Sequence, residues 1–191
     1  VEGHPLLTIP REVAEAEQLR AGQQLQEELY TRLCRAADEE AAFRTALRVL
    51  ERRPFAARDL SRRLVLKGHS PDSADAAVVR AEGLGLVDDA KFALHYAETR
   101  AARGRGPLRL RRDLALLGVS RIIVDRVLAE AFGADGAAAP QALPLAQKRL
   151  AQLKGLSRPV QRRRLLALLA RRGFSGSGVM KIVGELTASS A

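Results

Sequence analysis

The side chains that most often carry chemistry are few in this sequence of 191 residues, and they stand far apart. His4, His69 and His95 have no further ligand at the short spacings of a metal site, and Cys34 is the single cysteine. His69 lies between two turn signals, so we expect it to be exposed rather than a ligand. No metal site is therefore predicted.

Two other patterns could indicate an active site, and each has a simpler structural explanation. Asp88-Asp89 has the composition of an acid pair, but adjacent residues on a helix point apart, whereas the dipole at a helix N-terminus favours carboxylates there. Gly104-Arg105-Gly106 follows a helical pattern and precedes Pro107, which is the wrong context for a nucleotide-binding loop. The sequence therefore predicts a binding protein with no cofactor, and not an enzyme.

Positive charge is the one chemical property that this chain concentrates. Residues 1–40 hold 4 basic and 9 acidic side chains, a net charge of −5, and residues 41–99 hold 10 and 8, a net charge of +2. Residues 100–191 hold 18 and 5, a net charge of +13. Such a balance indicates polyanions or acidic protein surfaces as partners, although an Arg-rich chain can also carry charges that are simply solvated.

The predicted contact surface lies in this cationic half, on two helices and the turns before them. Around the helix expected over residues 107–117, Leu110, Leu114 and Leu117 define the inner face, so Arg109 and Arg112 are the better candidates for solvent. Arginine suits both carboxylates and phosphates, because its planar guanidinium can donate two parallel hydrogen bonds. The predicted partner-binding residues are Arg103, Arg105, Arg109, Arg111, Arg112, Lys154, Arg162, Arg163, Arg171 and Arg172.

The elements that position these cations repeat three times along the chain. Gly68, Gly118 and Gly173 serve as anchors, and each is followed two positions later by a serine. Leucines stand eight and four positions before each anchor, and an apolar residue stands ten positions after it. This spacing predicts equivalent buried leucines in three stacked units, namely Leu60, Leu110 and Leu165, with Leu64, Leu114 and Leu169.

Each unit is expected to hold three helices, so the fold class is all-α, an elongated tandem array of three three-helix repeats with a small N-terminal element. Prolines mark helix starts, and the anchor glycines are placed as left-handed caps. Before the repeats, Leu6–Ile9 could form a short strand and residues 10–19 a helix. The expected boundaries are 1–40 for the N-terminal element, 41–87, 88–133 and 143–187 for the repeats, and 134–142 for a linker.

Cysteine content and hydropathy indicate where such a protein works. A single cysteine cannot form a disulfide within the chain, which suits a reducing compartment. No apolar run approaches the roughly 18 residues of a membrane span. We expect a monomeric, cytoplasmic protein without membrane association.

Three stretches together resemble the RecX family of bacterial recombination regulators. Their order and spacing match over roughly residues 41–130, and the third repeat is consistent with them. The combination is specific, whereas each piece alone would not be. The stretches are Ala46-Leu47-x-x-Leu50-x-x-Arg53-Pro54-Phe55 with Asp59-Leu60-x-x-x-Leu64-x-x-Lys67-Gly68; Gly85-Leu86-Val87-Asp88-Asp89-x-x-Phe92-Ala93 with Arg100; and Gly104-x-Gly106-Pro107-x-Arg109-Leu110-x-x-Asp113-Leu114-x-x-x-Gly118-Val119.

The resemblance implies binding in the helical groove of the RecA–single-stranded DNA filament. There it implies inhibition of filament growth, ATP hydrolysis and strand exchange, with no cofactor and no reaction of its own. Two other functions remain open. Turn-separated basic helices permit direct binding of single- or double-stranded DNA in the manner of helix-turn-helix proteins. The same charge would also suit a scaffold for another acidic protein.

Overall fold

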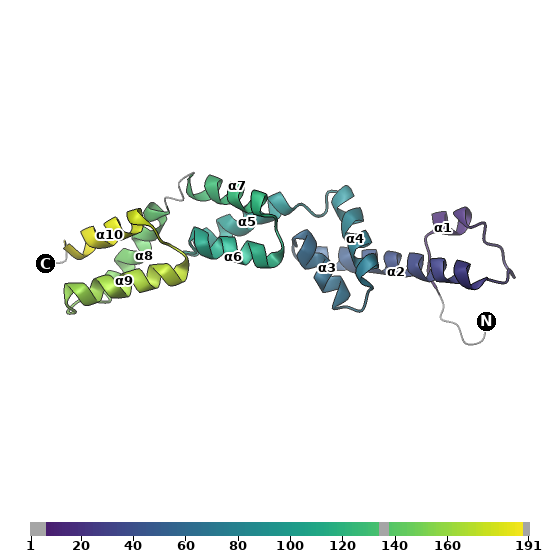
Figure 1. The fold of residues 1–191 in the computed structure, drawn as a ribbon, viewed down its shortest axis with the longest axis horizontal. Coiled ribbons are helices and arrows are strands. Elements are labelled where there is room, and N and C mark those ends of the chain that lie inside the picture. Colours follow the sequence, from purple (N-terminus) through teal and green to yellow (C-terminus); the bar gives the residue numbers. More distant parts are fainter. Residues whose placement is uncertain (1–6, 134–137, 189–191) are drawn as a thin grey trace. The chain divides into compact units, whose positions relative to one another are not determined.

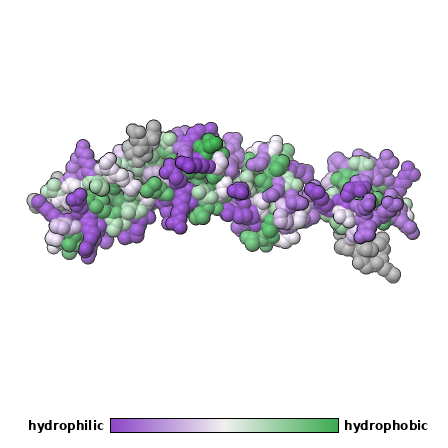
Figure 2. Space-filling model, viewed as in Figure 1, coloured by the Kyte–Doolittle hydropathy of each residue, from purple (hydrophilic) through white to green (hydrophobic). Residues whose placement is uncertain are grey.

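The structure is a computed structural model, which describes residues 7–133 and 138–188. Every regular element within these ranges is a helix, labelled α1 to α10 in Figure 1, so the all-α prediction is confirmed. The chain divides into two compact units, one ending at Asp88 and the other beginning at Asp89. Hydrophilic side chains cover much of the surface visible in Figure 2, with smaller hydrophobic patches between them.

The N-terminal unit contains α1 (Arg11–Ala16), α2 (Glu27–Leu50), α3 (Ala57–Val65) and α4 (Pro71–Gly83). Its first part differs from the expectation, because Leu7, Thr8 and Ile9 form no strand and α1 ends well before residue 19. Leu6 lies outside the described residues. Since α2 is continuous, the boundary expected at residue 40 falls inside this helix.

The three-helix repeat of this unit is formed by the second half of α2 with α3 and α4, and its turns follow the sequence signals. Gly68 has a φ of 98°, a left-handed conformation that costs other residues energy because of their Cβ. The Ser70 hydroxyl then accepts a hydrogen bond from the Ser73 backbone N–H, and Pro71 occupies the first turn of α4. The sequence therefore determines the α3–α4 turn by local chemistry.

The C-terminal unit contains two further three-helix repeats. The first is built from α5 (Asp89–Ala102), α6 (Pro107–Leu117) and α7 (Arg121–Phe132), and the second from α8 (Ala139–Ala151), α9 (Arg158–Arg172) and α10 (Ser177–Ala188). The linker expected over residues 134–142 is partly helical, since α8 begins at residue 139. Proline at residue 140 is compatible with that start, because the first helical turn needs no N–H bond there. Residues 134–137 lie outside the described ones.

The predicted leucine cores are confirmed in all three repeats. All six leucines have no exposed surface, and the apolar residues ten positions after the anchor glycines are also buried. The remaining core is built largely from alanine and valine, as the low aromatic content requires. The six fully buried leucines are Leu60, Leu64, Leu110, Leu114, Leu165 and Leu169.

Repeats two and three meet through the backbone at the start of α6 and the end of α9, a contact we call the glycine seam (Gly106 and Gly173). The Gly106 N–H donates to the Arg172 carbonyl at 2.7 Å, and the Leu108 N–H donates to the Gly173 carbonyl at 3.1 Å. The first N–H groups of a helix and its last carbonyls lack partners within the helix. At the seam, unpaired N–H groups at the start of α6 donate hydrogen bonds to unpaired carbonyls at the end of α9.

The seam leaves no room for side chains. A Cβ added at Gly106 would lie 2.5 Å from the Gly173 carbonyl oxygen, and one added at Gly173 would lie 2.4 Å from the backbone nitrogen of Arg109. Gly173 also has a φ of 90°, whereas the φ of Gly106 is −86°. Gly106 is therefore required for close approach alone, which makes it the cleaner position for a test.

Replacing Leu114 by Ala should lower the free energy of unfolding by about 2–5 kcal/mol, because a fully buried leucine leaves a cavity. Leu116→Ala is the matched control on the same helix, since Leu116 is 64% exposed, and it should change stability by less than about 0.5 kcal/mol. Chemical denaturation followed by circular dichroism measures both. Equal losses in the two variants would contradict the repeat core described above.

Replacing Gly106 by Ala should destabilise the C-terminal unit by about 1–3 kcal/mol, because the added methyl group overlaps backbone atoms that cannot move independently. The matched control is Gly184→Ala in α10, where an added Cβ meets nothing within 4 Å. That control should be neutral or stabilising by up to about 1 kcal/mol, since alanine is the better helix former. Amide hydrogen exchange at Gly106 and Leu108 shows whether the seam opens, and unchanged protection would refute its role.

Candidate polyanion-binding site

The arginines predicted as contacts on and before α6 are largely held by carboxylates of their own repeat. Arg105 and Arg109 both pair with Asp113, whose side chain is only 11% exposed, and the Arg109 Nε lies 3.1 Å from it. Arg111 pairs with Asp125 of α7 at 3.0 Å. These three cations are thus partly neutralised, and the Arg111–Asp125 pair also joins α6 to α7.

Two other predicted residues of this repeat, Arg103 and Arg112, are exposed and form no ion pair within the described part of the chain. The Arg103 carbonyl accepts a hydrogen bond from the Arg172 guanidinium at 3.2 Å across the seam. The structure therefore brings Arg172 to Arg103, 69 residues away in sequence, and the backbone of Arg109 lies against Gly173 beside them. Sequence periodicity could not show this proximity.

The third repeat presents its cations differently, because α9 contains no acidic residue. No arginine of α9 forms an ion pair among the described residues, and Arg162, Arg163 and Arg171 are exposed. Arg162 and Arg163, with Arg158 and the α10 residue Thr187, line a shallow cavity of about 610 Å³. Lys154, in the turn between α8 and α9, is exposed as well.

An unneutralised cationic helix is energetically unfavourable in isolation. Like charges four positions apart, such as Arg158 and Arg162, destabilise a helix by a few tenths of a kcal/mol. An anionic partner removes that repulsion. Arg162 and Arg172 are separated by about 15 Å along the helix axis at about 1.5 Å per residue, so α9 offers one cationic group near its start and another at the seam.

The structure also reveals a cationic cavity in the first repeat that sequence reasoning missed. It has a volume of about 260 Å³ and lies between the last turns of α2 and α3. The overall charge of residues 41–99 is close to balanced, which concealed it. The sequence did contain a signal for it, namely two pairs of cations whose members stand four positions apart, Arg48 with Arg52 and Arg63 with Lys67. The cavity is lined by Thr45, Arg48, Val49, Arg52, Phe55, Arg63 and Lys67.

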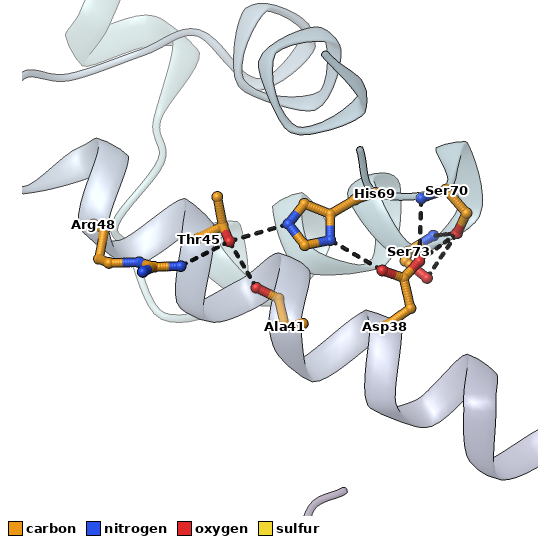
Figure 3. A network of polar contacts seen from close by, with 7 residues as sticks. All are labelled: Asp38, Ala41, Thr45, Arg48, His69, Ser70 and Ser73. Atoms are coloured by element: carbon orange, nitrogen blue, oxygen red, sulfur yellow. Dashed lines mark hydrogen bonds and ion pairs between the residues drawn. The ribbon is translucent and has the colours of Figure 1, made fainter. Parts of the chain in front are cut away.

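A polar network connects this cavity to the N-terminal half of α2 (Figure 3). The His69 ring contacts Asp38 at 3.0 Å through Nδ1 and Thr45 Oγ1 at 3.0 Å through Nε2. The Thr45 hydroxyl in turn accepts a hydrogen bond from the Arg48 guanidinium at 3.2 Å. The prediction that His69 is exposed was wrong, because its side chain is only 13% exposed in this network.

Asp38 is the acceptor on which the network ends. Partial burial by itself raises the pKa of this carboxyl, but hydrogen bonds from His69, Ser73 and Ser70 outweigh that effect and lower the pKa from 3.8 to about 2. The Ser70 backbone N–H and hydroxyl both donate to Asp38, at 3.1 and 2.8 Å. The carboxylate therefore ties α2 to the turn that begins α4.

The described residues contain no group of three histidine, cysteine or acidic side chains that could hold a metal ion. His4 lies outside them. Of the helices in the described ranges, none combines the length and the apolar character needed to cross a membrane.

The helical repeats of the C-terminal unit match two domain models of one protein family. The RecX second three-helix domain matches residues 88–128, and the RecX third three-helix domain matches residues 141–183. Over 141 residues, the chain is 36% identical to the regulatory protein RecX of Xanthomonas campestris pv. campestris, a match that covers 74% of this chain and 85% of that protein. The chain belongs to the RecX family. The resemblance predicted from the sequence is thus confirmed.

More distant RecX proteins extend the similarity. The regulatory protein RecX of Chlorobium phaeobacteroides is 29% identical over 150 residues, covering 78% of this chain and 95% of its own. Two RecX crystal structures share the fold. One has a TM-score of 0.77 over 93% of this chain and 86% of its own, at 21% identity. The other, from Lactobacillus salivarius, has a TM-score of 0.70 over 79% and 97%, at 19% identity.

Acid should weaken the Asp38 network in a defined pH window. Because the folded-state pKa of Asp38 lies below its ordinary value of 3.8, its stabilising contribution is present above about pH 4 and is lost as the pH falls toward 2. Asp38→Asn should remove that contribution at neutral pH. The free energy of unfolding should then depend less steeply on pH between 4 and 2 than in the unchanged protein. Parallel pH curves for the two proteins would refute the assignment.

Proposed function

We propose that this protein binds the RecA–single-stranded DNA filament in its helical groove and inhibits filament growth, ATP hydrolysis and strand exchange, without a reaction of its own. Its place of action would be the cytoplasm, where the recombinase filament forms. Membership of a family whose relatives are named regulatory proteins supports a regulatory role. The observation that supports the proposal further is the set of exposed arginines on α9, which form no ion pair with any described carboxylate.

Exposed apolar side chains favour a partner that contains protein over naked DNA. Two positions before the anchor glycines of the first two repeats stand Leu66 and Leu116, which are 88% and 64% exposed. Ile122, just after the second anchor, is 82% exposed. Protein–DNA interfaces are strongly cationic and polar, whereas the centres of protein interfaces bury apolar side chains. A filament of protein and DNA would accommodate both kinds of contact.

The test is inhibition of the ATPase activity of RecA from the same source on single-stranded DNA. Inhibition by fewer copies of this protein than of RecA supports action on the filament. Binding to naked DNA is measured in parallel over a range of salt concentrations. Tight, steeply salt-dependent DNA binding with no effect on the recombinase would favour the direct DNA-binding alternative.

Reversing charges on the proposed surface should weaken filament inhibition without unfolding the protein. We expect Arg162→Glu/Arg163→Glu to raise the concentration needed for half-inhibition by about tenfold or more, because charge-assisted contacts contribute roughly 1.5–3 kcal/mol each. Arg109→Glu/Arg112→Glu should have a smaller effect, since Arg109 is already paired with Asp113.

The matched control is Arg20→Glu/Arg126→Glu, which changes the net charge equally at two exposed arginines outside the predicted surface. Circular dichroism checks that all three variants fold. If the Arg162/Arg163 variant folds and inhibits as well as the control, α9 is not the contact surface.

A further inference from the structure

The cavity of the first repeat has a lining with an excess of positive charge. Four of its seven lining side chains are cationic and none is acidic. Arg48 and Arg52 come from the end of α2, whereas Arg63 and Lys67 come from the end of α3. The cavity therefore lies where the ends of two helices, from different parts of the sequence, come together.

Ion pairing elsewhere in this unit shows that its arginines do find acidic partners where these are within reach. Arg35 pairs with Glu39, and both Arg44 and Arg80 pair with Glu40 at 2.9 Å. By contrast, no ion pair of the described residues involves Arg48, Arg52, Arg63 or Lys67. The negative ends of the α2 and α3 dipoles offset part of this repulsion, but they do not neutralise four full charges.

Two of the four cations are held in place before any ligand arrives. The Arg48 guanidinium donates to the Thr45 hydroxyl, which is fixed through His69 to Asp38. The Arg63 guanidinium lies over the Phe55 ring, 5.4 Å from its centroid. Positioned cations lose less conformational freedom on binding than free ones, so this arrangement favours a specific anion site over a diffuse charged surface.

The lining of the cavity favours a nucleic-acid phosphate over a stacked nucleobase or a single carboxylate. Phe55 is only 3% exposed, and the Arg53 guanidinium lies 3.6 Å from the centroid of its ring, so little of that ring is open for stacking by a base. A phosphate offers several acceptor oxygens to arginine forks, and a nucleic-acid strand adds a charge at each neighbouring nucleotide. A backbone phosphodiester carries one negative charge, as a carboxylate does, but the phosphates of the adjacent nucleotides can neutralise the remaining cations, which a single carboxylate cannot.

We propose that this cavity binds a phosphate group of a nucleic-acid backbone, with Arg48, Arg52, Arg63 and Lys67 as its donors. The inference depends on the proposed function only for the origin of that phosphate, the single strand of the filament. It assigns the first repeat a direct contact with DNA, while the arginines of α9 contact the filament elsewhere. None of the four residues belongs to the surface predicted from the sequence.

The experiment uses the full chain without a recombinase. Backbone amide shifts are followed by NMR while inorganic phosphate replaces chloride at constant ionic strength, and again with a short oligothymidylate. Affinity for the oligonucleotide is measured by fluorescence anisotropy for the unchanged protein and two variants. Arg52→Gln/Lys67→Gln removes two charges from the cavity, and Arg58→Gln/Arg62→Gln removes two from other positions of the same repeat.

We expect both ligands to shift the backbone amide signals of residues 45–53, 55 and 63–67. The cavity variant should bind the oligonucleotide about tenfold more weakly, whereas the control should lose less than about threefold. Equal losses in the two variants would overturn the proposal, because only the net charge would then matter. The same cavity shifts with a polyglutamate peptide, but not with phosphate or DNA, would also overturn it in favour of an acidic protein ligand.

The outcome is separable from that of the recombinase assay. Phosphate binding at the cavity in a protein that does not inhibit RecA would uphold this inference and contradict the proposed function. Inhibition of RecA by a protein whose cavity binds no phosphate would contradict this inference and uphold the proposed function.

Discussion

Each repeat depends on the burial of two leucines, four positions apart, on its middle helix. In the first repeat, Leu60 and Leu64 are enclosed by small side chains of α2 and α4, including Ala42, Ala46 and Ala74, which have no exposed surface. Alanine lets the helix backbones approach closely, so a small amount of apolar volume suffices for a packed core. The same arrangement explains how a chain with 4% aromatic residues folds. It also explains why charge could spread over the outer faces without disturbing the packing.

The fold could be predicted where it depends on local sequence signals, and the prediction failed where it depends on contacts between residues far apart in sequence. The turn glycines, first-turn prolines and serine caps act within a few residues, so α3, α4 and α6 could be predicted closely from sequence. The predicted exposure of His69 failed because its partners, Asp38 and Thr45, lie 31 and 24 residues away on α2. The cationic cavity was missed for the same reason, since its two arginine-bearing helix ends are separate in sequence and only the fold brings them together.

The predicted site shows a second limit of sequence reasoning, because counts of charge do not reveal which charges are paired. Arg105, Arg109 and Arg111 contribute to the net charge of +13 over residues 100–191, yet all three contact carboxylates of their own repeat. The arginines of α9 have no such carboxylate partner in the part of the chain that the structure describes. The surface that we propose for a polyanion is therefore narrower than the composition implied, with its exposed cations mainly in the third repeat and in the cavity of the first.

The glycine seam makes the spacing between repeats two and three a property of the main chain. The hydrogen bonds that Gly106 and Leu108 donate across it join backbone atoms, at 2.7 and 3.1 Å, and a Cβ on either glycine would overlap the backbone opposite. Surface residues on α6 and α9 can consequently diverge without changing the distance between these helix ends. Substitutions on the outer faces of α6 and α9 can thus change what the two repeats recognise. The distance between the two recognising surfaces stays constant, because the main chain sets it.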